Sequence, residues 1–200
     1  MIATVTAGYL LGSLPAADVA GRLVGMSPRS AGTGNPGALN ATALLGVRWG
    51  AAVGVVDVAK GWAAAVLGAR VSPNAAYASA TAAVLGHVFP PWSRFHGGKG
   101  VATSYGAVLG AFPAYAVPDL AVATVAARLT GDPRRATHIA SAVWTGAALL
   151  WWRRRLPNLW GPDPTVGLPV SAALISALIA WRMRRPDRVR SNIRPGNWKG

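Results

Sequence analysis

The residues best suited to chemistry gather between Gly86 and Gly106, a stretch that reads GHVFPPWSRFHGGKGVATSYG. It carries two histidines, an arginine, a lysine and five glycines between two apolar runs. Glycines leave backbone N–H groups open to a ligand, and the helical pattern that restarts after Val101 would add a positive helix end. This composition predicts a phosphate-binding loop, with a flexible turn as the alternative. The residues expected to bind the phosphate are Gly97, Gly98, Lys99 and Gly100.

A second glycine-rich loop occupies residues 30–46, which read SAGTGNPGALNATALLG. Its glycines and proline are typical of a tight loop, and Asn40 is placed to cap the helix that follows. The loop offers hydroxyl, amide and backbone donors and no acids, so it is a second candidate anion site. Two such loops on one face predict a phosphorylated ligand, or two of them side by side.

Two pairs of charged residues lie inside apolar runs. Asp18 and Arg22 are four residues apart, and Asp57 and Lys60 are three apart, so each pair shares one helical face. Charges at membrane depth are costly and usually face a protein interior or a water-filled cavity. Each pair is therefore either a structural ion pair or part of a site, in which Lys60 would be a second cation near the loops.

The composition is that of a membrane protein. Hydrophobic residues make up 52% of the 200 residues and charged residues only 13%, about half the proportion usual in soluble domains. Seven apolar runs recur, several of them rich in Ala and Gly as expected of helices that pack against helices. They cover residues 2–24, 49–69, 73–89, 101–114, 115–129, 136–152 and 166–183. We expect one all-α membrane domain over residues 1–200 with about seven transmembrane helices, the first kinked or ended at Pro15.

Basic residues predict the orientation, because lysine and arginine collect in cytoplasmic loops. With the N-terminus outside, fifteen of the twenty basic residues fall on the cytoplasmic side, and only Arg70 and the 153–155 cluster fall on the outer side. The sequence therefore predicts an N-out, C-in topology. Both glycine-rich loops are then cytoplasmic, as is a basic tail over residues 183–200.

The net charge and the residue types limit which partners and metal ions the chain is expected to bind. The formal net charge is +14, and about a third of the basic residues lie in the short tail beside a span, so anionic membrane lipids are a simpler partner than nucleic acid. Cysteine is absent, which excludes a disulfide and a thiolate metal site. The three histidines and six acids are scattered, and we expect neither a metal nor a cofactor.

Four ordered motifs resemble those of one family. They are Gly12-Ser-Leu-Pro, Gly32-Thr-Gly-Asn-Pro-Gly-Ala with Asn40, Asp57-x-x-Lys60-Gly61, and Gly86-His-x-Phe-Pro with Gly97-Gly-Lys-Gly-Val-Ala-Thr103. On these motifs the chain is identified as a divergent member of the PlsY family, bacterial membrane acyltransferases that use acyl-phosphate and glycerol-3-phosphate. The resemblance implies a seven-helix protein of the bacterial plasma membrane, with its active site at the cytoplasmic face.

The resemblance also implies site residues at matching positions, to which the sequence adds Lys60. The catalytic set is His87, Lys99 and Asn40. The phosphate-binding set is Thr33, Gly34, Asn35, Gly37, Lys60, Gly97, Gly98, Gly100, Thr103, Arg135 and Asn192. Thr33 stands where the family usually has serine and keeps the hydroxyl.

Several positions depart from the family pattern. Leu39 replaces a threonine, Ala43 occupies the place of an arginine, His138 aligns with a serine, and Val189 replaces a histidine. Two alternatives to the family reaction follow. The chain is either a retired lipid-phosphate binder or transporter, or an acyltransferase with another acceptor, in which Arg135 or the tail arginines replace the missing cation.

The implied reaction sets three physical requirements. The acceptor hydroxyl must be held near the donor carbonyl, the departing phosphate must be stabilised, and a proton must be removed. The two loops are suited to the first two, and the base is either His87 or the donor's own phosphate. Because there is no cysteine and no serine in a recognisable nucleophile motif, we expect direct transfer that yields lysophosphatidate and phosphate without a covalent intermediate.

Overall fold

The computed structural model describes residues 1–184, and every regular element in this part of the chain is helical. The all-α class is therefore confirmed for these residues. The α-helices are α1 (Ile2–Gly12), α2 (Ala16–Val24), α3 (Ala38–Leu45), α4 (Val47–Ala69), α5 (Pro73–Val88), α6 (Val101–Ala111), α7 (Ala116–Thr130), α8 (Pro133–Arg154) and α9 (Gly167–Arg184). Two short 3-10 helices are η1 (Pro91–Ser93) and η2 (Pro113–Tyr115).

Each predicted apolar run contains a helix. The break at Pro15 agrees with the sequence, whereas the position of Asn40 does not. The first run is divided into α1 and α2 at Pro15, as its missing N–H group predicts. Asn40, however, does not cap the helix that follows the second glycine-rich loop. That helix, α3, begins at Ala38 with Gly37 before it, so Asn40 lies inside its first turn.

The number of membrane crossings stays a prediction. Among the described residues, segments 2–24 and 47–69 are long and apolar enough to cross a membrane. A third qualifies if α6 and the segment Pro113–Thr130, which meet at a bend of 118°, are taken as one. Helices α5, α6 and α7 have 16, 11 and 15 residues, fewer than the roughly 20 that a perpendicular span requires.

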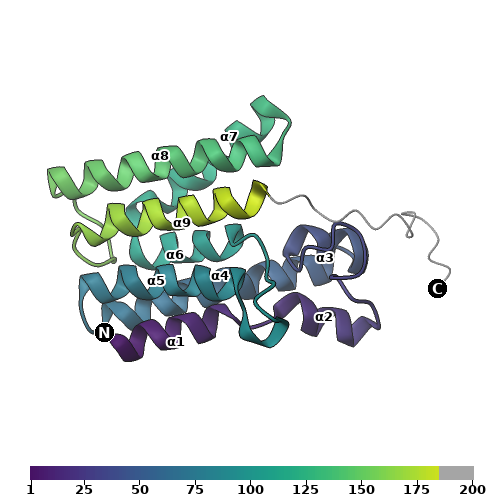
Figure 1. Ribbon diagram of the computed structural model, residues 1–200. Helices are drawn as coiled ribbons and strands as arrows, with labels where there is room; N and C mark the ends of the chain where they lie inside the picture. The colour runs from purple at the N-terminus through teal and green to yellow at the C-terminus, as the bar shows by residue number, and fades with distance from the viewer. Residues whose placement is uncertain (185–200) are drawn as a thin grey trace.

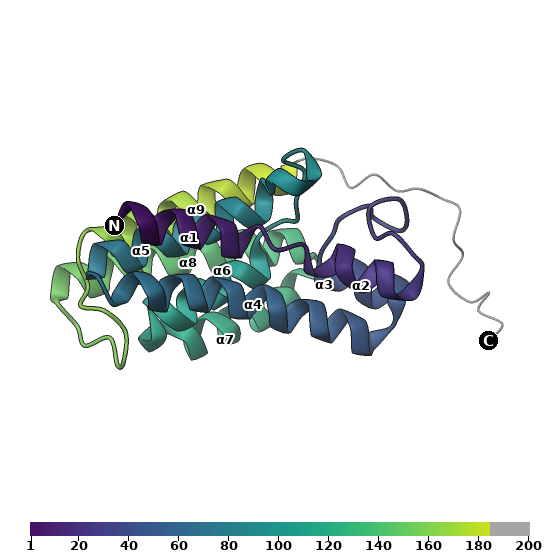
Figure 2. The same ribbon diagram turned by 90° about the horizontal axis from the view of Figure 1, so that it is seen from below.

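The long helices lie side by side, and the glycine-rich loops meet at one end of them. Figures 1 and 2 show α1, α4, α5, α8 and α9 running along the long axis of the molecule. The N-terminus and the loop between α8 and α9 lie at one end, whereas α2, α3 and the loop after α5 lie at the other. The two stretches singled out by the sequence, which residues 47–85 separate along the chain, are thus brought together.

Small residues set the spacing of α4 and α6. A Cβ atom added to Gly61 would lie 2.1 Å from the carbonyl oxygen of Thr103, and one added to Gly106 would lie 1.9 Å from that of Val58. Both distances are far below van der Waals contact, so the two backbones touch only because these residues are glycines. This close contact fixes the position of α6, which begins shortly after Lys99, relative to α4.

Candidate active site

Two cavities open at the end of the molecule where the loops meet. The first, here called the Lys99 cavity, has a volume of about 780 Å³ and is bordered by Asn40, His87 and Lys99. The second, the arginine cavity, has a volume of about 1020 Å³ and lies between α2, the loop after α5 and the end of α9. Thr33 and Asn35 line both cavities and form the wall between them.

The N-terminus of α6 faces the Lys99 cavity. Gly100 precedes the helix with a φ of 86°, which glycine adopts without strain, and no side chain caps the helix. The amide of Ser104 donates to the carbonyl of Gly100, so the N–H groups of residues 101–103 come before the first intrahelical bond. Residues 99–102 line the cavity. The positive helix end and the Lys99 ammonium therefore border the same space, which suits an anion.

The amides of Gly97 and Gly98 have a different task from the one expected. Gly97 donates to the carbonyl of Val88 at 2.9 Å, and Gly98 donates to that of His87 at 3.1 Å. These bonds tie the loop to the end of α5, so neither N–H group is open to a ligand in this structure. The open backbone donors of the loop come instead from the first turn of α6.

His87 borders the Lys99 cavity and lies beside two buried charges. Its Nδ1 atom is 3.5 Å from Oδ1 of Asp57, and the same oxygen lies 2.8 Å from Nζ of Lys60. Lys60 is only 4% exposed and also donates to the carbonyl of Leu14 at 3.2 Å. It borders neither large cavity but a void of about 20 Å³, room for about one water molecule. Lys60 therefore forms the structural ion pair, and a role in phosphate binding stays a prediction.

No side chain of residue 98 covers Nε2 of His87, because that residue is a glycine. A Cβ atom at Gly98 would lie 2.2 Å from that nitrogen. The carboxylate of Asp57 favours a proton on Nδ1 of His87, which leaves Nε2 able to accept one. This arrangement is suited to proton removal from a bound hydroxyl.

Asn40 shapes the first loop through its side-chain amide. Its Oδ1 atom accepts from the amide of Thr33 at 3.0 Å, and its Nδ2 atom donates to the carbonyls of Pro28 at 2.8 Å and Ala31 at 3.3 Å. Gly32, at a φ of 57°, passes so near that a Cβ atom would lie 2.4 Å from Oδ1. These contacts position the loop, and direct participation of Asn40 in catalysis stays a prediction.

Asn35 has an unsatisfied polar atom at the wall between the cavities. Its Oδ1 atom is buried and has no hydrogen-bond partner within residues 1–184. Gly37 makes room for this side chain, since a Cβ atom there would lie 2.9 Å from Nδ2 of Asn35. Gly34 borders the arginine cavity and Gly37 the Lys99 cavity.

Two other predicted site residues, Thr103 and Arg135, border neither cavity, and a third lies outside the described residues. Thr103 is fully buried against α4, with no hydrogen-bond partner for its hydroxyl among the described residues. The side chain of Arg135 is 76% exposed and lies 3.6 Å from Asp132, whereas its neighbour Arg134 borders the Lys99 cavity. The N–H of Arg134 holds the pKa of Asp132 below its ordinary value of 3.8. Asn192 lies outside the described residues.

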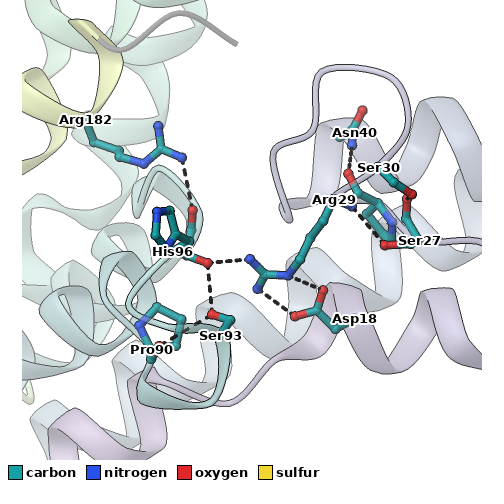
Figure 3. Close-up of polar contacts among 11 residues, drawn as sticks. Asp18, Ser27, Arg29, Ser30, Asn40, Pro90, Ser93, His96 and Arg182 are labelled. Atoms are coloured by element: carbon teal, nitrogen blue, oxygen red, sulfur yellow. Dashed lines mark hydrogen bonds and ion pairs between the residues drawn. The ribbon is translucent and has the colours of Figure 1, made fainter. Parts of the chain in front are cut away.

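Sequence reasoning missed Arg29, which joins the two loops. Its guanidinium donates to both carboxylate oxygens of Asp18, each at 2.7 Å, and to the carbonyl of His96 (Figure 3). Of the two alternatives for Asp18, the ion pair is present, but its partner is Arg29 instead of Arg22. Helical spacing cannot identify Arg29, because it lies in the loop beyond the end of α2. On the other side, Arg182 donates to the carbonyl of Gly97 at 3.1 Å (Figure 3).

The two cavities differ in charge. The arginine cavity is bordered by one aspartate, Asp18, and by four arginines, at positions 22, 29, 94 and 182. The Lys99 cavity is bordered by two cations and by three acids, at positions 57, 119 and 132. The positive excess among the described residues thus lies in the arginine cavity. No group of three or more His, Cys, Asp or Glu within residues 1–184 is arranged to hold a metal ion.

An apolar groove of about 670 Å³ lies beside the Lys99 cavity along α4 and α6. Val58 and Ala102 border both spaces. From there the groove extends past Trp62 and Leu109 to Trp160 in the loop between α8 and α9. A cavity that has Lys99 in its lining, next to an apolar groove, accommodates a molecule with a charged head and a hydrocarbon tail.

Comparison with known proteins gives concordant findings. A family model described as glycerol-3-phosphate acyltransferase matches residues 2–190. A glycerol-3-phosphate acyltransferase of Pseudomonas syringae pv. syringae is 37% identical over 182 residues, covering 90% of this chain and 88% of that protein. One of Brucella suis is 39% identical over 144 residues, 72% of each chain.

Solved structures agree with these relatives. The crystal structure of PlsY, an integral membrane glycerol 3-phosphate acyltransferase, in its glycerol 3-phosphate form superposes with a TM-score of 0.79 at 30% identity, covering 92% of this chain and 88% of that one. Its lysophosphatidic acid form gives a TM-score of 0.77 at 29% identity, with 92% and 87% covered.

Proposed function

Because this chain belongs to the glycerol-3-phosphate acyltransferase family, we propose that it transfers an acyl chain from an acyl-phosphate to the 1-hydroxyl of glycerol-3-phosphate. The products are lysophosphatidate and phosphate, and the reaction is the first acylation of phospholipid synthesis. The relatives named above are acyltransferases, and two solved relatives carry glycerol 3-phosphate and lysophosphatidic acid in their names.

The observation that carries this proposal is the position of the apolar groove beside the Lys99 cavity, with Val58 and Ala102 in the lining of both. An acyl-phosphate has a dianionic head and a long alkyl chain, and each part meets its own surroundings here. The head lies near Lys99 and the first turn of α6, where an ammonium and unbonded N–H groups attract phosphate. The chain enters the groove at Val58 and Ala102, in contact with apolar side chains alone.

The proposed chemistry is a direct substitution at the acyl carbon. The hydroxyl oxygen of the acceptor forms a bond to the carbonyl carbon of the donor, and the bond from that carbon to the phosphate oxygen breaks. Phosphate leaves with the electron pair and is stabilised by Lys99 and the α6 N–H groups. The hydroxyl proton moves to Nε2 of His87, which Asp57 orients, or to an oxygen of the departing phosphate.

We also propose that the chain crosses the bacterial plasma membrane seven times, N-out and C-in. Two observations support this topology. Each of the seven apolar runs contains a helix. The ends of α1 and α5 and the start of α6 gather at the end of the molecule that holds the cavities, away from the loop between α8 and α9. The cavities then open to the cytoplasm, where soluble glycerol phosphates are available.

The test is acyl transfer by the purified protein in detergent, with palmitoyl-phosphate and glycerol-3-phosphate as substrates. We expect lysophosphatidate and phosphate in equal amounts, and a loss of about 100-fold or more in kcat for Lys99→Ala, since one preorganised donor at a developing charge is worth that much. The matched control is Arg70→Ala, which removes a cation at the C-terminal end of α4, away from both cavities. Full activity of folded Lys99→Ala would contradict the site.

One observation favours a second candidate, a protein that binds these lipids or uses another acceptor. Leu39 and Ala43, which replace a threonine and an arginine of the family pattern, both border the Lys99 cavity. If folded protein binds palmitoyl-phosphate but forms no product with glycerol-3-phosphate, this second candidate replaces the first.

A further inference from the structure

Three consecutive arginines lie at the end of the molecule opposite the two cavities and take no part in the proposed reaction. Arg153 and Arg154 form the last turn of α8, and Arg155 follows it at the start of the loop to α9 (Figures 1 and 2). We infer that this Arg153–Arg155 cluster binds the phosphate groups of anionic phospholipids in the surrounding membrane. Such binding is independent of acyl transfer.

The length of α8 places the cluster at the depth of lipid head groups. The helix has 22 residues, and at a rise of about 1.5 Å per residue it is about 33 Å long. The hydrocarbon core of a bilayer is about 30 Å thick. Arg134, near the start of the helix, borders the Lys99 cavity. With α8 crossing the membrane, as proposed above, the cluster therefore lies in the head-group layer opposite that cavity.

The positive charge of the cluster is not neutralised by the protein. All three arginines are exposed, and none forms an ion pair with an acid within residues 1–184. The loop that follows, residues 155–166, contains one acid, Asp163, against the three formal positive charges of the cluster. Guanidinium groups suit a phosphate, because two parallel N–H groups can meet two of its oxygens. The cluster is therefore complementary to an anionic head group.

The loop after the cluster also presents large apolar side chains at its surface. Leu159 is 67% exposed and Trp160 is 73% exposed. Tryptophan is enriched where a membrane meets water, because its ring is apolar and its N–H is polar. A soluble phosphate would leave both side chains in water. A phospholipid matches the whole surface, since its phosphate lies beside its hydrocarbon chains.

Hydrogen bonds hold this loop in one conformation. Nε1 of Trp151 donates to the carbonyl of Pro157 at 3.1 Å. Asn158 is only 5% exposed, and its Nδ2 atom donates to the carbonyls of Ala111 at 3.0 Å and Pro162 at 2.8 Å. The loop is thus ordered before any lipid arrives, which lowers the entropic cost of binding.

The experiment measures lipid binding to the full-length protein in neutral detergent. Phosphatidylglycerol and, separately, phosphatidylcholine are titrated in, and native mass spectrometry gives the apparent Kd of each. The test variant is Arg153→Gln/Arg154→Gln. The matched control is Arg48→Gln/Arg128→Gln, which removes two exposed arginines that border neither cavity and gives the same net charge. A third variant, Arg155→Gln, changes a residue beyond the last one of α8 and so leaves the helix intact.

We expect the test variant to bind phosphatidylglycerol about 10-fold or more weakly, as lost hydrogen bonds to a charged group predict. Arg155→Gln should weaken binding in the same direction, whereas the control should bind as the wild type does. The inference is overturned if the folded test variant binds phosphatidylglycerol as tightly as the control, or if the wild type binds phosphatidylcholine equally well. Should the test variant not fold, unchanged binding by Arg155→Gln overturns it. Because no turnover is measured, failure of the proposed reaction leaves this result unaffected.

Discussion

Substitution of Gly98 by alanine tests whether His87 acts in the reaction. The added Cβ atom would lie 2.2 Å from Nε2 of His87 and 3.0 and 3.1 Å from the two ring carbons beside it. Since ordinary contact begins at 3.4 Å, the imidazole must retreat by 1.2 Å, the difference between 3.4 and 2.2 Å. Asp57 on the other side of the ring limits this movement, because it already lies 3.5 Å from Nδ1.

The displaced imidazole is expected to reduce turnover far more than stability. A misplacement of about 1 Å in a catalytic group costs on the order of 100-fold in rate, whereas overpacking costs about 1–3 kcal/mol in the free energy of unfolding. Gly98 is not in the left-handed region, so alanine is tolerated by the backbone itself. The control is Gly146→Ala in α8, where an added Cβ atom meets nothing within 4 Å.

The assay is acyl transfer at saturating palmitoyl-phosphate, with thermal unfolding of the same samples. Because Gly98→Ala acts through His87, the double variant with His87→Ala should be no slower than His87→Ala alone. A Gly98→Ala protein that unfolds earlier but turns over at the wild-type rate would refute the reasoning. His87 would then be a packing residue, and the departing phosphate would remain as the base.

Two further predictions concern stability. Arg29→Gln should lower the free energy of unfolding by about 1–3 kcal/mol, because the half-buried carboxylate of Asp18 loses its charged partner. Denaturant titration in detergent measures this change. An unchanged midpoint would show that the ion pair does not stabilise the fold. Gly61→Ala should lower it by about 3 kcal/mol, the upper end for overpacking, since the new methyl meets a backbone oxygen at 2.1 Å. Gly54→Ala on the same helix, where the nearest atom is 3.5 Å away, should change stability little, and equal effects of the two would contradict the proposed close contact of α4 and α6.

The helices could be predicted from the sequence because their signals are local. A run of apolar residues identifies a buried or membrane helix, and Pro15 ends α1 whatever surrounds it. The seven runs therefore locate helices correctly, and the ordered glycine motifs identify the family. Whether each helix crosses the membrane cannot be predicted from its own residues alone. Several helices are short and rich in alanine and glycine, so they suit a membrane only when neighbouring helices pack against them.

The partners of the polar residues were decided by the tertiary structure. Helical spacing suggested Arg22 as the partner of Asp18, but the chain turns after α2 and brings Arg29 back to that carboxylate. The side-chain amide of Asn40 bonds to the loop, since its helix begins at Ala38, three residues earlier than the capping pattern suggested. Neighbouring Arg134 and Arg135 are alike in sequence, and only the rotation of α8 about its axis places the first at the cavity.

The residue types and the helices that carry them follow from the sequence alone: a membrane chain of helices, two glycine-rich loops, and a lysine shortly before a helix. Three further features depend on how the chain folds: the loops meet, the amides of Gly97 and Gly98 are already bonded, and a cavity rich in arginine lies beside the one that contains Lys99. The reason is physical. Backbone conformation depends mainly on neighbours in the chain, whereas the bonds of a donor and the charge of a cavity depend on residues that folding brings from far apart.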